Sequence, residues 1–207
     1  MNVTVADIKN VVLDMCDIII KNEVYFCELD SVAGDGDFGM SLSKGFKEVK
    51  EQIDEIDISN PTTFLRGCSM IISEKCGGAS GPIWGSAFRA AGVAVKDKDS
   101  LSLDDVASMF SAAVAGIQKR GGAQLGDKTL LDALIPASQA LTDAAQSGKS
   151  ICEAFDDAVK AANDGAEKTK EMVASKGRAT YLGERSLGHP DAGAAAIGLL
   201  LTELTSN

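Results

Sequence analysis

The sequence has little of what several protein classes require. Only 5% of its 207 residues are aromatic, and it contains a single histidine. Its 20 lysine and arginine residues face 30 aspartate and glutamate residues, and they form no basic run that could follow a nucleic-acid backbone. Nucleic acid is therefore not an expected partner. A net charge of -10 still permits binding of an anionic nucleotide, provided that metal ions and helix N-termini offset the local charge.

Cysteine is present without the spacing of a metal site. No CxxC pair occurs, and the five cysteines lie far apart, mostly inside apolar helical patterns: Cys16, Cys27, Cys68, Cys76 and Cys152. This favours free buried thiols. No apolar stretch approaches the roughly 18 residues of a membrane span, and no basic region followed by an apolar core opens the sequence. We therefore expect a cytoplasmic protein without a membrane partner.

Helical periodicity runs through the whole chain. Apolar residues recur every three to four positions and alanine is abundant, which favours an all-α fold over sheets. The length suits one domain, residues 1–207, with 45% hydrophobic residues to form a core. Eight helices are predicted: from about residue 4, from about 38, 61–77, 81–95, 102–120, 128–146, 150–176, and from 190.

The connections between these helices are of two kinds. In an up-and-down bundle, the links after the first, third, fifth and seventh helices share one end. All the unusual links fall in this set: 30–37, 77–81, 121–127 and 177–190. The other links are ordinary turns. The helices that follow the unusual links point their N-termini toward that end, where unpaired N–H groups could bind an anion.

Three carboxylates in the first of these links are candidate metal ligands. Asp30, Asp35 and Asp37 are interspersed with Gly34 and Gly36, a pattern too charged for packing. Magnesium prefers carboxylate oxygen and completes its shell with water and phosphate. The alternative is a solvated turn in which Asp37 caps the second helix. An EF-hand does not fit, because the twelfth position of such a loop lacks the required glutamate.

Two glycine-rich links are compatible with phosphate binding. Residues 77–81 could let backbone N–H groups approach a phosphate, although close packing around Trp84 explains them as well. Residues 122–129 read G-A-Q-L-G-D-K-T, but Asp127 stands where a P-loop requires lysine, so a P-loop is excluded. Lys128 could instead orient Asp127 or a loop carbonyl.

The last link holds the remaining candidate groups. Arg178 could reach a phosphate or form a salt bridge with Glu184 or Asp191. His189 lies beside Pro190, and no serine or cysteine nucleophile motif accompanies it. A ring held by contacts at the helix N-terminus is therefore expected, and not a catalytic base.

Four motifs together resemble the L subunit (DhaL) of dihydroxyacetone kinases, across almost the whole chain. They are G-D-G-D at 34–37, G-A-S-G-P at 78–82, G-D-K-T-L-L-D-A-L at 126–134 and G-R-A-T-Y-L-G-E-R-S at 177–186. The resemblance implies an eight-helix barrel with ADP or ATP at its mouth and two Mg²⁺ ions on Asp30, Asp35 and Asp37. It also implies nucleotide contacts from Phe38, Gly39, Met40, Ser41, Ala79, Ser80, Gly121, Leu130, Arg178, Asp191, Ala192 and Gly193.

The same resemblance implies the function and the partners. The triose would be held by a separate K subunit, and the phosphoryl donor would be ATP or a phosphohistidine protein, the M subunit, of the phosphotransferase system. Phosphotransferase-linked members have histidine and asparagine where this chain has Phe38 and Ser41, which favours ATP. A second copy of the chain, forming a homodimer, is a further candidate partner. The alternatives are a kinase subunit for another short ketose or polyol and a nucleotide-sensing regulatory protein without chemistry.

Overall fold

Helices make up most of the structure, which is a computed structural model describing residues 2–206. Its α-helices are α1 Val5–Lys21, α2 Glu23–Ser31, α3 Phe38–Gln52, α4 Pro61–Lys75, α5 Ser80–Ala94, α6 Leu103–Gly121, α7 Leu131–Gln146, α8 Ile151–Lys168 and α9 Ala192–Thr205. Two 3-10 segments, η1 Thr169–Glu171 and η2 Arg178–Ser186, connect α8 to α9. The two short strands β1 Val3–Thr4 and β2 Ser100–Leu101 pair antiparallel.

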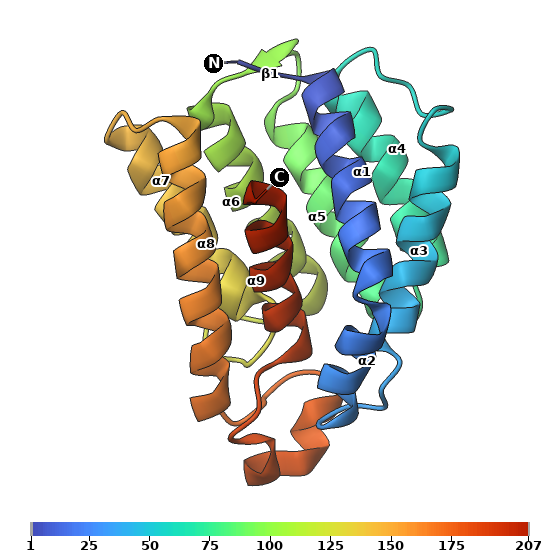
Figure 1. Ribbon diagram of the computed structural model, residues 1–207, viewed down its shortest axis with the longest axis vertical. Coiled ribbons are helices and arrows are strands. Elements are labelled where there is room, and N and C mark those ends of the chain that lie inside the picture. Colours follow the sequence, from blue (N-terminus) through green and yellow to red (C-terminus); the bar gives the residue numbers. More distant parts are fainter. Residues whose placement is uncertain (1, 207) are drawn as a thin grey trace.

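The helices form a closed antiparallel ring (Figure 1). Each helix from α3 to α9 packs beside the next, α1 packs beside α3, and α9 returns to α1. Helices α1 and α2 together occupy one position, so the ring has eight positions, and the predicted eight-helix barrel is confirmed. The break between them lies at Asn22, whose side-chain amide donates to the carbonyl of Ile18 (2.9 Å) and to Glu203 (3.3 Å). An amide that competes for a helical carbonyl in this way interrupts a helix.

The core lies between these helices, and its two sides differ in the size of the buried side chains. Phe26, Phe46 and Phe64 are fully buried on the side of α2 to α4, and the ring of Phe46 meets that of Trp84 edge to face at 5.9 Å. Alanines and a glycine form the buried face of α8, and alanines alternate with leucines on that of α7. Small residues let these two helices approach closely. None of the helices in the described range is long and apolar enough to cross a membrane.

The cysteines are all free, as expected, but only three of them are buried. Burial raises the pKa of Cys16 and Cys68 to about 12 and that of Cys76 to about 11, so these thiols are unreactive at neutral pH. Cys27 is half-buried and Cys152 is exposed. The prediction of buried thiols was therefore wrong for Cys152.

Side chains cap every helix that begins at the β1–β2 end of the barrel. Asn60 accepts a hydrogen bond from the backbone of Thr63 at the start of α4. Capping boxes open the other three helices, with Thr4 and Asp7 at α1, Ser102 and Asp105 at α6, and Ser150 and Glu153 at α8. The predicted helix starts near residues 4, 102 and 150 are thus confirmed.

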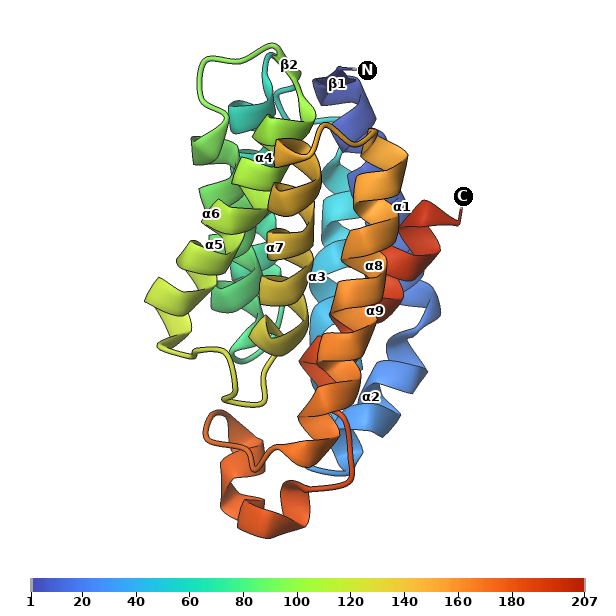
Figure 2. The ribbon, with the colours of Figure 1, turned by 90° about the vertical axis from the view of Figure 1, so that its left-hand side faces the viewer.

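The link between α8 and α9 is longer than the sequence indicates. Helix α8 ends at Lys168, about eight residues before the predicted end, because Thr169 is buried and its hydroxyl accepts a hydrogen bond from the backbone of Asp191 (2.8 Å). The following residues leave the barrel and return to it (Figure 2). We call residues 170–190 the cap segment. Smaller differences are the start of α7 at Leu131 and of α9 at Ala192.

Candidate metal and anion site

One cavity lies at the end of the barrel opposite β1 and β2. Its volume is about 250 Å³, and its wall includes residues of three of the four unusual links, together with residues 128–130, which directly follow the link 121–127. The lining residues fall within five stretches: 29–38 with Ser41, 77–80, 128–130, 176–179 and 190–193. The gathering of these links at one rim is therefore confirmed.

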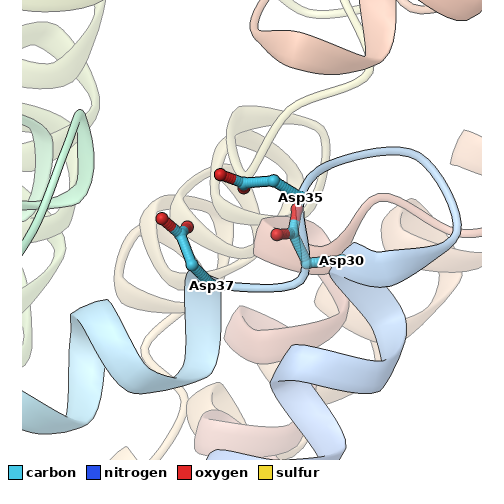
Figure 3. A group of neighbouring side chains, drawn as sticks. All are labelled: Asp30, Asp35 and Asp37. Atoms are coloured by element: carbon cyan, nitrogen blue, oxygen red, sulfur yellow. The ribbon is translucent and has the colours of Figure 1, made fainter.

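The three predicted metal ligands converge at this cavity (Figure 3). Asp30 lies in the last turn of α2, Asp35 in the connecting loop, and Asp37 directly before α3. Each offers a carboxylate oxygen, and these oxygens all lie within 4.8 Å of one another. The loop is held in this shape by Gly36, whose φ of +74° suits glycine and whose N–H donates to Asp30 (2.9 Å).

The local geometry fits a small hard cation. A Cβ atom at Gly34 would stand 2.2 Å from the carboxylate of Asp30, so glycine is required for the loop to pass this close. Asp37 makes no side-chain cap of α3, which removes the capping alternative and leaves its carboxylate free for another partner. Three carboxylates in close proximity repel one another, and a divalent cation would offset that repulsion.

Helix N-termini at this rim differ from those at the other end. The N-cap residues of α3, α5 and α7, which are Asp37, Ala79 and Leu130, form no side-chain cap. The carboxylate of Asp191 caps α9, at 2.8 Å from the N–H of Ala194, and the hydroxyl of Thr129 accepts the N–H of Leu131 at the start of α7 (3.2 Å). Uncapped N–H groups and the positive ends of helix dipoles are therefore concentrated at the cavity, an arrangement that favours an anion such as a phosphate.

A buried charged cluster lies behind the cavity wall. Burial raises the pKa of Asp191 to about 7; Asp132 acts in the same direction, and Lys128 against it. Asp132 is 1% exposed and accepts hydrogen bonds from the N–H groups of Gly126 (2.5 Å) and Thr129 (2.7 Å). With its pKa raised to about 7, the carboxyl group of Asp191 is only partly ionised at neutral pH, which lowers the negative charge that an incoming anion would meet.

Arg178 joins the cap segment to the metal-ligand loop. Its guanidinium pairs with Asp35, and not with Glu184 or Asp191 as one alternative expected. Both side chains are about half exposed, so the pair is accessible to water and to ligands. The guanidinium consequently stands between the carboxylate loop and the cavity, within reach of a bound phosphate.

Most of the residues expected to contact a nucleotide line this cavity. They are Phe38, Ser41, Ala79, Ser80, Leu130, Arg178, Asp191, Ala192 and Gly193. Gly39, Met40 and Gly121 are not among the lining residues. Gly39 is buried against α2, where an added Cβ would stand 1.9 Å from the carbonyl oxygen of Glu23, and Met40 is 55% exposed.

The sequence left the roles of two basic residues open, and the structure shows the contacts of each. Lys128 is 3% exposed and donates to loop carbonyls, which was one of its two expected roles. Its φ of +60°, rare outside glycine, leaves no signal in the sequence. The ring of His189 is exposed, and within residues 2–206 it makes no hydrogen bond, so the expected contact with the helix N-terminus is not found. The backbone carbonyl of His189, by contrast, accepts a hydrogen bond from Lys128.

Comparison with known proteins points to one family. The DAK2 domain model matches residues 32–206. The chain is 40% identical over 200 residues to the PEP-dependent dihydroxyacetone kinase 2, ADP-binding subunit DhaL, of Listeria innocua, covering 96% of this chain and 92% of the relative. It is 34% identical over 204 residues to the PEP-dependent dihydroxyacetone kinase, ADP-binding subunit DhaL, of Escherichia coli, covering 99% and 97%.

A solved structure gives the same result. The dihydroxyacetone kinase from C. freundii in complex with AMP-PNP and Mg²⁺ superposes with a TM-score of 0.76 at 26% identity. The match covers 97% of this chain and 34% of that chain. This chain thus corresponds to about one third of the larger kinase polypeptide.

Proposed function

Because this chain belongs to the DAK2 domain family, we propose that it is the nucleotide-binding subunit of a dihydroxyacetone kinase. The observation that carries the proposal is the single cavity wall at which the carboxylates of Asp30, Asp35 and Asp37 meet the N-termini of α3 and α5, which have no side-chain cap. Relatives of matching length are named ADP-binding subunits, and the C. freundii kinase was solved with AMP-PNP and Mg²⁺.

The proposed ligand sets follow from this geometry. Asp30, Asp35 and Asp37 would hold Mg²⁺, two ions by family resemblance, which when bound neutralise charge on the transferred phosphoryl group. The expected nucleotide contacts, residues 38–41, 79–80, 121, 130, 178 and 191–193, stay predictions, and Gly39, Met40 and Gly121 among them do not line the cavity.

The protein groups would act by positioning. Phosphoryl transfer requires alignment and charge stabilisation more than covalent participation. The N–H groups that begin α3 and α5 would orient phosphate oxygens, while the guanidinium of Arg178 would pair with them. Because the three aspartates serve as metal ligands in this scheme, none of them acts as a base, and no residue of this chain forms a covalent intermediate.

The acceptor would lie on another protein. We assign residues 1–207 to a single domain, whose cavity at the rim is small and open to solvent. A K subunit would hold dihydroxyacetone against that rim, so that the phosphoryl group passes between two proteins. Another short ketose could be served by the same nucleotide subunit with a different K-type partner.

The proposed donor is the phosphohistidine protein, since the relatives that match this chain over nearly their full length are named PEP-dependent. This differs from the expectation drawn from Phe38 and Ser41. The ring of Phe38 packs against the buried ring of Phe26, with centroids 6.0 Å apart, so its identity reflects the contact between α2 and α3 as much as the cavity. In this scheme ADP is rephosphorylated in place.

Reconstitution tests the proposal. The isolated chain is expected to transfer no phosphate to dihydroxyacetone, because it supplies nucleotide and metal sites but no triose pocket. Adding a K subunit, Mg²⁺ and a source of phosphohistidine protein should restore transfer, followed as dihydroxyacetone phosphate formed over time. Turnover by the chain alone would show that the acceptor site is misplaced. Nucleotide binding without transfer in the complete mixture would support the nucleotide-sensing alternative.

A further inference from the structure

The cap segment is fastened to the barrel at its base by a buried lysine. The ammonium group of Lys128 donates hydrogen bonds to the carbonyl oxygens of Thr169 (2.6 Å) and His189 (2.7 Å), which stand at the two ends of the segment. Thr169 in turn accepts the N–H of Asp191 at its hydroxyl. The side chain of Lys128, in the α6–α7 link, therefore holds the cap segment both where it leaves the barrel and where it returns.

The neighbouring residue fastens the same segment further out. The hydroxyl of Ser175 donates to the carboxylate of Asp127 (2.5 Å), and its N–H donates to the carbonyl of Asp127 (3.3 Å). The Asp127 carboxylate also accepts the N–H of Gln124 (2.7 Å), which fixes it within its own loop. Ser175 stands three residues before Arg178, so this contact sets where the guanidinium can reach.

Internal contacts alone do not set the orientation of the cap segment. The N–H of Gly188 donates to the carbonyl of Lys170 (2.8 Å), and Ser186 accepts the N–H of Ala174 (3.0 Å). These bonds give the segment its own shape but do not join it to α7. The side-chain hydrogen bonds between the cap segment and the link before α7 are made by Asp127 and Lys128. The cap segment also contacts the metal-ligand loop, through the exposed ion pair of Arg178 with Asp35.

The energetic cost of placing a lysine at position 128 indicates a specific role for this residue. Lys128 is 3% exposed, so its ammonium group loses part of its hydration, and neutral carbonyls compensate only when they are well placed. Its backbone also adopts the left-handed region at φ +60°, which is unfavourable for a side-chain-bearing residue. A methionine would fill the same space without the cost of charge burial and with the same backbone cost, so packing alone does not explain a lysine here.

We propose that Lys128 and Asp127 are positioning residues that latch the cap segment and thereby hold Arg178 at the nucleotide cavity. This rests on the proposed function for its consequence, but the latch itself exists without a ligand. Lys128 acts through Arg178 in this proposal and does not itself bind the nucleotide.

Limited trypsin digestion of the nucleotide-free protein tests the latch. The cap segment contains Lys170, Lys176, Arg178 and Arg185 as cleavage sites. In Lys128→Met we expect cleavage there to become roughly tenfold faster, because loss of charge-assisted hydrogen bonds raises the population of the open segment. Lys44→Met, which removes an exposed lysine of α3, is the matched control and should be cut as the wild type. Equal cleavage rates in all three proteins would overturn the proposal.

A double-mutant cycle tests the link to Arg178. With Mg²⁺ present, Lys128→Met should weaken ADP binding roughly tenfold in the wild-type background, yet change it less than about twofold when Arg178→Gln is already present. Additive losses would show that Lys128 acts on the nucleotide independently of Arg178. If the wild type binds no ADP, the proposed function fails, while the digestion still decides whether the latch exists.

A surface variant keeps the test valid if Lys128→Met does not fold. Ser175→Ala removes only the hydroxyl that reaches Asp127, and Ser175 is exposed. We again expect faster cleavage of the cap segment and a loss of ADP affinity that disappears when Arg178→Gln is present. On a logarithmic scale, each effect should be about half that of Lys128→Met. Wild-type behaviour in both assays would refute the role of Asp127.

Discussion

At the scale of single residues, the carboxylate loop shows how the sequence sacrifices stability for a site. Asp30, Asp35 and Asp37 carry like charges within 4.8 Å, and only Arg178 is paired with them. Without a cation, this repulsion opposes folding. Such a local conflict is expected at functional positions and uncommon elsewhere.

The substitution Asp37→Asn tests this view. It removes a proposed ligand, so Mg²⁺-dependent affinity for ADP should fall by at least roughly tenfold, measured by calorimetric titration. In magnesium-free buffer the same variant should unfold at an equal or higher urea concentration than the wild type, because one repulsive charge is gone. Asp14→Asn, an exposed aspartate of α1, serves as the control and should change neither quantity. Wild-type ADP affinity in Asp37→Asn would refute the ligand assignment.

Sequence reasoning succeeded where the determinants were local. The spacing of the three aspartates and two glycines lies within eight residues, and it identified the metal-ligand loop directly. The role of Lys128 could not be assigned in the same way, because the carbonyls that it binds are 41 and 61 residues away. The partner of Arg178 was also missed, since Asp35 is far from it in the chain.

At the scale of elements, the helix starts were more predictable than one helix end. The sequences at Thr4, Ser102 and Ser150 contain their own caps. The end of α8 depends on the capture of Thr169 by Asp191, a tertiary contact that overrides the helical pattern beyond it. The break at Asn22 likewise depends on Glu203, which is contributed by the last helix.

The glycines at helix contacts give a prediction at this scale. Gly39→Ala should destabilise the protein by about 1–3 kcal/mol, because its methyl group would collide with the backbone of α2, which cannot move without shifting the metal-ligand loop. Gly121→Ala is the matched control. There an added Cβ meets only the flexible end of Ile83, at 2.9 Å, and stability should be unchanged or slightly higher.

Urea unfolding measures both variants, with the slope of the transition held as a check on two-state behaviour. A loss of ADP affinity in Gly39→Ala without loss of stability would indicate a direct contact with the nucleotide. The family resemblance implies that contact, whereas the packing of Gly39 against Glu23 argues for an indirect effect.

At the scale of the whole molecule, antiparallel topology explains why the site could be foreseen. Alternate links must share one end of an up-and-down ring, so residues separated by more than 150 positions were expected to meet. The identity of the donor does not follow from topology, because ATP and a phosphohistidine protein place different demands on the rate of nucleotide release and not on the fold.

The rate of nucleotide release, which distinguishes the two donors, can be measured on the purified protein. If ADP is rephosphorylated in place, the protein prepared without added nucleotide should contain nearly one ADP per chain, which survives dialysis and does not exchange with labelled ATP. A slow off-rate is the physical requirement, and a latched cap segment beside the cavity is consistent with it. Asp37→Asn should retain no ADP. Rapid exchange with labelled ATP in the wild type would assign ATP as the donor.

The seam between α1 and α9 has a consequence for how the protein is made. Lys21 and Asn22, at the end of α1, both bind Glu203 in the last helix, at 3.0 and 3.3 Å. The ribosome makes α1 before α9, so the faces of α1 and α8 that α9 covers stay uncovered while the helices between them are translated. The ring therefore cannot close before α9 has been made, and a message truncated within α9 would yield a chain that chaperones and proteases treat as unfinished.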